Sequence, residues 1–326
     1  IDRSRGLGDV YKRQMVYYNK YCATFIIILI VFFACDDNQI EKIYINRFEQ
    51  EFFSSKKSDL KKIIKKYPYL FPSTYDNNVW ESYLVDSTRI ATFKKTNTIF
   101  NNMEKIQEQI SISFNLIESI FSNFKKPKVI TLNSQDEYEN RIIYADSLLL
   151  ISLDQYLGSE YYPAIPSYIT YNMTKKYISN DISQKISEKL VTSPTDRSLL
   201  AEMIYHGKII YLTKLFTPYN DDHLKFHTTR EKINWAYENE KYIWAFFVEN
   251  DLLFSTKAEL KSSFISFAPF SKFNLEIDKY SPGGIGKWLG YRIVDSYMRN
   301  NNIEPSQLSV KDFYEIFSES NYKPKK

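Results

Sequence analysis

Histidine, cysteine and glycine are scarce in this chain of 326 residues, which holds three, two and eight of them. A zinc site is normally built from cysteine and histidine, so few ligands are at hand for one. The sequence contains no CxxC pair, no HExxH motif and no EF-hand loop. Serine, histidine and aspartate do not occur in an order typical of hydrolases. We therefore predict no catalytic residue, no metal and no cofactor.

The chain also has no large excess of charge of either sign. Lysine and arginine total 43 and aspartate and glutamate total 39, which gives a net charge of +4. The two signs are interleaved along the chain, whereas nucleic-acid-binding proteins concentrate positive charge. This balance predicts no nucleic acid partner. Aromatic residues are abundant, with 27 Tyr and 23 Phe, but together with many Ile, Lys and Asn they indicate AT-rich coding rather than a function.

The chain begins with segments that we expect to lie outside the folded domain. The segment DVYKRQ, Asp9 to Gln14, resembles a translated sequencing-adapter end, so we interpret residues 1–14 as a non-native leader; a disordered polar leader is the alternative. Residues 15–34 start with methionine and contain an apolar run from Cys22 to Ala34, which suits a lipoprotein signal peptide. That run is shorter than the about 20 residues of a membrane span. An uncleaved signal anchor is the alternative.

The predicted signal peptide ends in Phe32-Phe33-Ala34-Cys35, which resembles the lipobox of bacterial lipoproteins. Polar residues come directly after it, so we predict cleavage before Cys35 and lipidation of Cys35. Two or more acyl chains hold a protein stably on a membrane, and residues 35–45 would form the lipidated tether. Cleavage would leave a single cysteine and hence no internal disulfide. The expected location is the cell envelope, with the protein anchored by palmitate-type chains and facing the periplasm.

Apolar periodicity over residues 46–326 predicts a single, mostly helical domain. The expected fold class is α-rich α+β, with a small central β-sheet formed by residues 128–132, 141–144 and 147–153. Helices are expected on both sides of these strands along the chain. Their predicted ranges are 44–67, 79–92, 101–124, 163–178, 181–190, 196–216, 228–250, 281–300 and 310–319.

Four of the eight glycines lie in one stretch, SPGGIGKWLG, at residues 281–290. A phosphate-binding loop requires GxxxxGK[ST], but Trp288 stands where Ser or Thr would hold magnesium. The dinucleotide pattern GxGxxG also fails, because Gly290 falls one residue late. The stretch therefore excludes a nucleotide partner and predicts a helix start, with Ser281 as N-cap and Trp288 on the buried face. The other glycines would permit close packing of this helix start: Gly283, Gly284 and Gly286.

The histidines supply two further candidates. His223 and His227 have the i, i+4 spacing of a helical zinc pair, but Leu224 replaces the glutamate of a metallopeptidase, and we expect a surface loop. Glu202 and His206 are also four residues apart on one helix, and if their side chains meet, the carboxylate would favour a protonated imidazole. We prefer the alternative that they are a solvated or half-buried polar pair.

Glu240 falls on the apolar face of the helix expected over residues 228–250. A carboxylate in that position needs an internal partner or has a function, and we favour a structural partner such as Arg292. These patterns together nominate one candidate cleft for binding. Its residues are Glu202, His206, Glu240, Ser281, Gly283, Gly284, Gly286 and Trp288.

Several segments resemble, in order and spacing, the family of the gliding motility lipoprotein GldB. They are LDQYLG at 153–158, YYPAIP at 161–166, MIYHGK at 203–208, IWAFFVENDLLFST at 243–256 and SPGGIGKWLGYRIV at 281–294. That family is similar to a group of predicted zinc proteases, so the resemblance implies a zincin-like protease fold of the gluzincin type. The helix that would carry HExxH, residues 167–179, has no histidine, which argues against retained zinc chemistry.

The resemblance implies an accessory protein of gliding motility and of the associated protein secretion machinery. We expect it to act by binding rather than catalysis, with the membrane and other gliding or secretion proteins of the envelope as partners. The missing HExxH motif favours a protein that is not an enzyme. Two alternatives stay open: a zinc-protease-derived hydrolase with a degenerate metal site at Glu202 and His206, and an envelope glycan-binding lipoprotein that uses its aromatic residues.

Overall fold

The computed structural model describes residues 41–325, so the predictions for residues 1–40, including lipidated Cys35, lie outside the described residues. Residues 41–326 form one compact unit. The described part contains fifteen α-helices and a four-stranded sheet, which confirms the predicted α-rich α+β fold class. Among residues 41–325, no helix combines the length and the apolar character that a membrane crossing needs.

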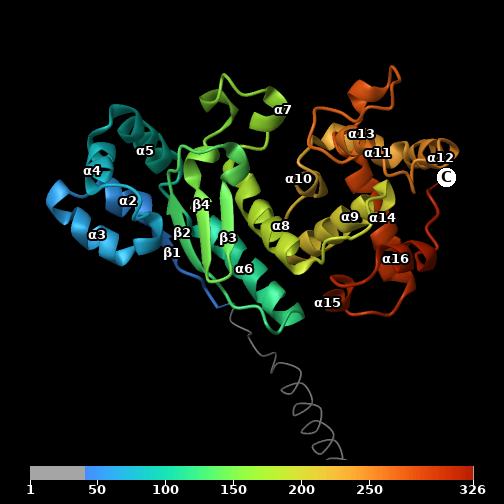
Figure 1. Ribbon diagram of the computed structural model, residues 1–326, viewed down its shortest axis with the longest axis horizontal. Helices are drawn as coiled ribbons and strands as arrows, with labels where there is room; N and C mark the ends of the chain where they lie inside the picture. Colours follow the sequence, from blue (N-terminus) through green and yellow to red (C-terminus); the bar gives the residue numbers. More distant parts are fainter. Residues whose placement is uncertain (1–40, 326) are drawn as a thin grey trace, which may run out of the picture. The chain divides into compact units, whose positions relative to one another are not determined.

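Short helices come between the first strand of the sheet and the other three in the chain, and they lie on one side of the sheet (Figure 1). The predicted helix over 44–67 is divided, because Ile45–Arg47 pairs as strand β1 and the first helical residue is Phe48. The predicted helix over 79–92 is divided as well, since Asp86 has an extended backbone and its carboxylate accepts the N–H of Arg89. The helices are α2 (Phe48–Phe53), α3 (Leu60–Lys66), α4 (Asn77–Val85) and α5 (Ser87–Ile99).

The sheet confirms all three predicted strands and adds a fourth. Its order is β1-β2-β4-β3, with β2 (Lys128–Leu132), β3 (Ile142–Ala145) and β4 (Leu148–Ser152). Strands β1, β2 and β4 are parallel, and β3 runs antiparallel to β4. Strand β1 was not predicted because its three residues are too few to show an alternating pattern.

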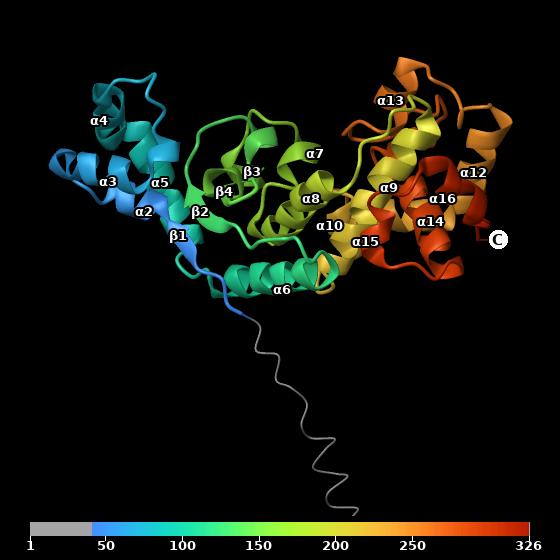
Figure 2. The same ribbon diagram turned by 60° about the horizontal axis from the view of Figure 1, so that its bottom comes forward.

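Helices cover both faces of the sheet, which explains why its strands are apolar throughout. Ile130 packs with α2 and α3 on one face. Val129 and Leu149 pack on the other face against α6 (Glu104–Ile120) and α8 (Ile178–Leu190). Both ribbon views place α2–α5 and α8 on different sides of the strands (Figures 1 and 2).

The prediction of one helix over residues 163–178 is wrong. Only α7 (Ser167–Thr170) and a 3₁₀ turn form there, because Thr174 is extended and bridges Leu157. The predicted helix over 228–250 is interrupted at Asn239, whose backbone leaves helical geometry. The remaining helices are α9 (Leu199–Phe216), α10 (Asp222–Lys225), α11 (Arg230–Glu238), α12 (Glu240–Glu249), α13 (Ala258–Phe264), α14 (Ile285–Asn300), α15 (Pro305–Leu308) and α16 (Phe313–Glu319).

Helix α9 belongs to two hydrophobic cores. Its N-terminal half, including Met203, packs among the C-terminal helices α11–α14 and α16. Its C-terminal half, including Phe216, packs with the sheet, α6 and α8. The middle of α9 therefore lies where the two cores meet, and any site there is shaped by both.

Glycines let α9 and α14 approach to backbone contact. A Cβ on Gly290 would lie 1.8 Å from the carbonyl oxygen of Met203, and one on Gly207 would lie 2.4 Å from the carbonyl carbon of Gly290. The predicted close packing of the helix start also holds, since a Cβ on Gly283 would lie 1.8 Å from the carbonyl oxygen of Ala268. Only glycine is compatible with these separations.

Candidate functional site

A small cavity of about 40 Å³ lies where the middle of α9 faces the end of α10 and the start of α14. Its lining includes apolar side chains such as Ile209 and Trp288, and these polar or charged ones: Gln184, His206, Lys225, His227, Ser266 and Lys287. Four predicted cleft residues line it: His206, Gly283, Gly284 and Trp288. The other four lie outside its lining: Glu202, Glu240, Ser281 and Gly286.

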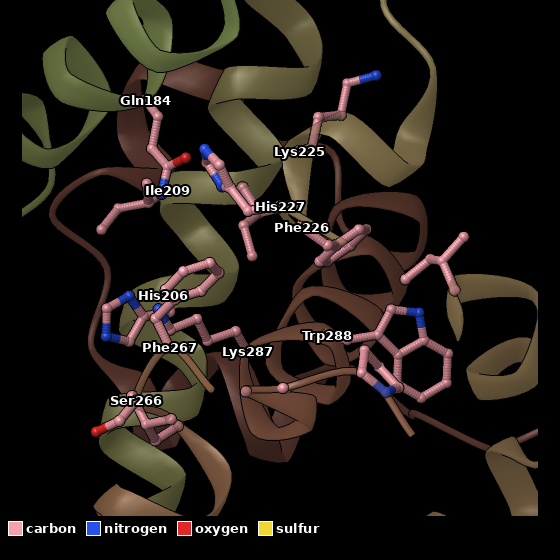
Figure 3. Close-up of a pocket in the computed structure, with 16 residues that line it drawn as sticks. Gln184, His206, Ile209, Lys225, Phe226, His227, Ser266, Phe267, Lys287 and Trp288 are labelled. Atoms are coloured by element: carbon pink, nitrogen blue, oxygen red, sulfur yellow. The ribbon is translucent and has the colours of Figure 1, made fainter. Parts of the chain in front are cut away.

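The side chains around this cavity come from distant parts of the chain (Figure 3). In that view His227 and Gln184 lie above His206 and Lys287. The amine of Lys225 points away from them, and it donates to the backbone carbonyl of Asn220 at 2.6 Å. Two histidines and one lysine therefore face the same space, a combination that the sequence patterns did not predict.

The start of α14 differs from the prediction. Helix α14 begins at Ile285, and the N-cap is Gly284, which has a left-handed backbone with φ of +68°. Ser281 is not the N-cap: its hydroxyl accepts the N–H of Ser271 at 3.0 Å and donates to the carbonyl of Asp278 at 2.7 Å. A residue with a left-handed backbone cannot be part of a right-handed helix. Helix α14 therefore cannot extend to the N-terminal side of Gly284, and the residues before it form a loop. Trp288 is buried as predicted.

His206 and Glu202 are both half-buried, in agreement with the preferred prediction, and His206 is neutral rather than protonated beside the carboxylate. Burial, together with the positive charges of Lys287 and Lys261, lowers the pKa of His206 to about 3. The nearest oxygen of Glu202 is 4.0 Å from His206 Nε2, and the other oxygen binds the ammonium of Lys261 at 2.6 Å. The carboxylate is thus neutralised by a lysine that lies 59 residues away in the chain, and the sequence pattern could not show this.

His227 is held by a buried carboxylate. Its Nε2 lies 2.7 Å from Oδ1 of Asp181, whose other oxygen binds Arg141 at 2.9 Å and the hydroxyl of Tyr156 at 2.8 Å. Burial raises the pKa of Asp181, but the charge of Arg141 and the bond to His227 outweigh it and lower the pKa below its ordinary value. The ring of His227 also stacks on Tyr177. The imidazole is therefore fixed at the cavity wall.

Lys287 carries a charge that no group in residues 41–325 pairs with. Within the described residues its ammonium forms no ion pair and no hydrogen bond, although Glu188 and Glu202 are near enough to attract it. Burial lowers the pKa of Lys287, because the charged form loses water that no protein group replaces. A half-buried cation in this state is destabilising for the fold, which is typical of residues kept for a function.

The model of the family described as "Gliding motility protein GldB" matches residues 34–324. The chain belongs to the GldB family. It is therefore a gliding motility protein, and the family points to a lipoprotein of the cell envelope. No curated protein and no solved structure gives a significant match. The zincin-like character expected of this GldB-family fold accordingly stays a prediction.

Glu240 of this GldB-family protein has a structural partner, and the predicted partner Arg292 is confirmed. Its carboxylate oxygens bind the Arg292 guanidinium at 2.8 and 3.3 Å, and the hydroxyl of Tyr322 adds a bond of 2.8 Å. The side chain of Glu240 is buried. The pair joins α12, α14 and the C-terminal segment, so Glu240 serves the packing of the C-terminal helices.

In this GldB-family chain, the segment around His223 is a short buried helix rather than the surface loop that its sequence pattern predicted. His223 lies in α10 with its Nδ1 buried, and it lines a groove of about 570 Å³ separate from the cavity. His223 and His227 thus face different spaces and do not form the i, i+4 pair. Among residues 41–325, no group of three histidine, cysteine, aspartate or glutamate side chains is placed to hold a metal ion.

The sequence patterns of this GldB-family chain did not point to Asp181, Arg141 or Lys287 as residues of the site. One signal could have pointed to Asp181: helix α8 carries Ser179, Asn180 and Asp181 beside the apolar residues that contact the core, and all three are buried. A polar run at the buried end of a helix predicts an internal network. No comparable signal exists for Lys287, because lysine is common on exposed helix faces.

Proposed function

We propose that this GldB-family protein is held at the envelope membrane by acyl chains on Cys35, faces the periplasm, and works by binding other proteins of the gliding and secretion machinery. The apolar run before Cys35 supports the anchor, and so does the family match, which begins at residue 34. Family membership supports a role in gliding.

Binding rather than catalysis is supported by one observation: the acids near the candidate site are already paired within the protein. Glu202 binds Lys261, and Asp181 binds Arg141 and His227. A general base must reach its substrate with a free lone pair, and these carboxylates direct theirs at internal cations. Among the charged groups that line the cavity, Lys287 is the one whose ammonium has no partner within the described residues, and it attracts a ligand but does not act as a base while charged.

The anchor is tested by Cys35→Ser. We expect this variant to accumulate as an unlipidated, uncleaved precursor, because the thioether cannot form on serine. Cells are grown with radioactive palmitate, and the labelled protein is isolated and measured. Wild type should carry the label and Cys35→Ser should carry none. A variant that keeps the label contradicts the proposed anchor, and Cys22→Ser is the matched control that should behave as wild type.

The binding function is tested by copurification. Native protein is isolated from detergent-solubilised membranes after brief crosslinking, and the proteins that accompany it are identified. We expect gliding or secretion proteins to be recovered in constant ratio with wild type. If wild type purifies alone after crosslinking, or if Glu202→Gln abolishes gliding while every partner is retained, binding is not the mode of action.

A further inference from the structure

We propose that the cavity beside α9 binds one carboxylate group, supplied by a partner protein and held between the ammonium of Lys287 and the imidazole of His206, with the ring of His227 at the cavity wall. The inference rests on the proposed function, because a protein that acts by binding offers this cavity a partner. It goes beyond that function by naming the chemical group, a carboxylate, that the partner must present. The site is drawn in Figure 3.

The charge of the cavity selects an anion. Lys287 lines it without an ion pair or hydrogen bond in the described residues, and Lys261 lies close enough to influence the same histidine. These two cations are among the reasons why the imidazole of His206 does not accept a proton. The same repulsion opposes a metal ion. An arriving carboxylate gives the half-buried Lys287 a partner that the described residues do not supply, and the ion pair is stronger there than in bulk water.

The neutral imidazole of His206 completes the site as a hydrogen-bonding group. A neutral histidine has one N–H donor and one acceptor nitrogen, so His206 offers an N–H to a carboxylate oxygen. The Nε2 of His227 is used by Asp181 at 2.7 Å, so the ring of His227 forms part of the cavity wall beside the guest. Gln184 brings a buried side-chain oxygen that has no partner among the described residues. Rotation of that amide turns its NH₂ group toward the guest.

The volume limits the guest to a single small group. One water needs about 10–15 Å³, so a cavity of about 40 Å³ accommodates two or three waters or the atoms of one carboxylate. A sugar ring or a nucleotide does not fit. The guest is therefore the end of a chain or side chain, with the rest of the partner outside the cavity. Capture of a chain terminus in this way is a known mode of peptide recognition.

Histidine NMR tests the inference, because the chain contains only three histidines. Detergent-purified full-length protein labelled at histidine Cε1 is titrated with acetyl-Ala-Ala, its C-terminal amide, acetyl-Asp-amide and inorganic phosphate. We expect at least one carboxylate probe to shift the signals of His206 and His227 saturably, while His223 and the neutral dipeptide amide give no shift. Acetyl-Ala-Ala and acetyl-Asp-amide separate a chain terminus from an acidic side chain. Tighter binding of phosphate than of either carboxylate overturns the proposal.

Lys287→Met removes the charge with nearly the same side-chain length, and Lys175→Met is the matched control, since Lys175 lines the other groove. We expect Lys287→Met to lower the affinity for the carboxylate probe at least tenfold without lowering the melting temperature. Lys175→Met should bind the probe as wild type does. Equal binding by Lys287→Met overturns the inference. If no probe binds while partners still copurify, the carboxylate site alone is wrong. If probes bind and no partner copurifies, the proposed function is wrong.

Discussion

Gly290→Ala is expected to lower the free energy of unfolding by about 3 kcal/mol. The new Cβ would lie 1.8 Å from the carbonyl oxygen of Met203 and 2.3 Å from its carbonyl carbon. Both are backbone atoms within α9, so no side chain can rotate to make room. Overpacking of a core costs about 1–3 kcal/mol and occasionally more. Here the two helices must move apart as whole elements, which places the effect at the upper end.

The cost of Gly290→Ala extends beyond the contact itself because α9 contributes to both cores. Urea unfolding monitored by circular dichroism measures the change. Arg299→Ala, at the exposed end of the same helix, is the control, and its loss should stay within about 0.5 kcal/mol. A Gly290→Ala protein that unfolds at the wild-type urea concentration would show that the helices do not meet at this point. Gly207→Ala should be destabilising for the same reason, since its partner is Gly290.

Asp181→Leu is expected to destabilise the protein by about 3–5 kcal/mol, the usual cost of breaking a buried ion pair by removing one partner. The carboxylate is 6% exposed and Arg141 is 14% exposed, so the variant leaves a guanidinium away from water without its counter-charge. His227 loses the bond that positions its ring as well. The same urea experiment measures this loss. A variant as stable as wild type would contradict the buried network.

The double variant Asp181→Leu with Arg141→Met separates the charge effect from packing. Because both ions are removed, most of the stability lost in Asp181→Leu should return. If the two losses simply add, the ion pair is not the cause. Asp181→Leu should also leave the Lys287 ammonium unchanged, so binding of a carboxylate probe should weaken only through the freed His227 ring.

The same pair predicts a dependence of stability on pH. The pKa of Asp181 in the folded protein lies below its ordinary value of 3.8, so the unfolded chain takes up the proton first. The contribution of Asp181 is therefore complete above pH ~4 and is lost as the pH falls through the lower folded-state pKa. Wild type should lose stability in that acid range, and the double variant should lose less of it.

Several features of this protein were predictable from the order of its residues because they depend on near neighbours in the chain. The three central strands result from short runs of β-branched and aliphatic residues, and they occur within a residue of the predicted ranges. The buried face of α14 results from the helical spacing of Trp288, Ile293 and Tyr297. Family membership was predicted from segments such as SPGGIGKWLG and is confirmed over residues 34–324.

Helix ends and interruptions were predicted less well, again for a physical reason. The N-cap of α14 is Gly284 rather than Ser281, because the hydroxyl of Ser281 is used by a loop ten residues earlier. The helix expected over 163–178 is broken because Thr174 pairs with Leu157. In both cases a contact outside the segment competes with the local preference and wins.

The candidate site was decided almost entirely by tertiary structure. The i, i+4 spacing of Glu202 and His206 left open whether the histidine is protonated, and burial together with two lysines from other elements lowers its pKa to about 3. Asp181 meets His227 across 46 residues, and no periodicity records such a pair. The periodicity of apolar residues shows which face of an element is buried, so the amino-acid order determined that feature by itself. Desolvation and the distance between charges exist only once the elements have packed, so the electrostatics of the cavity had to come from the folded protein.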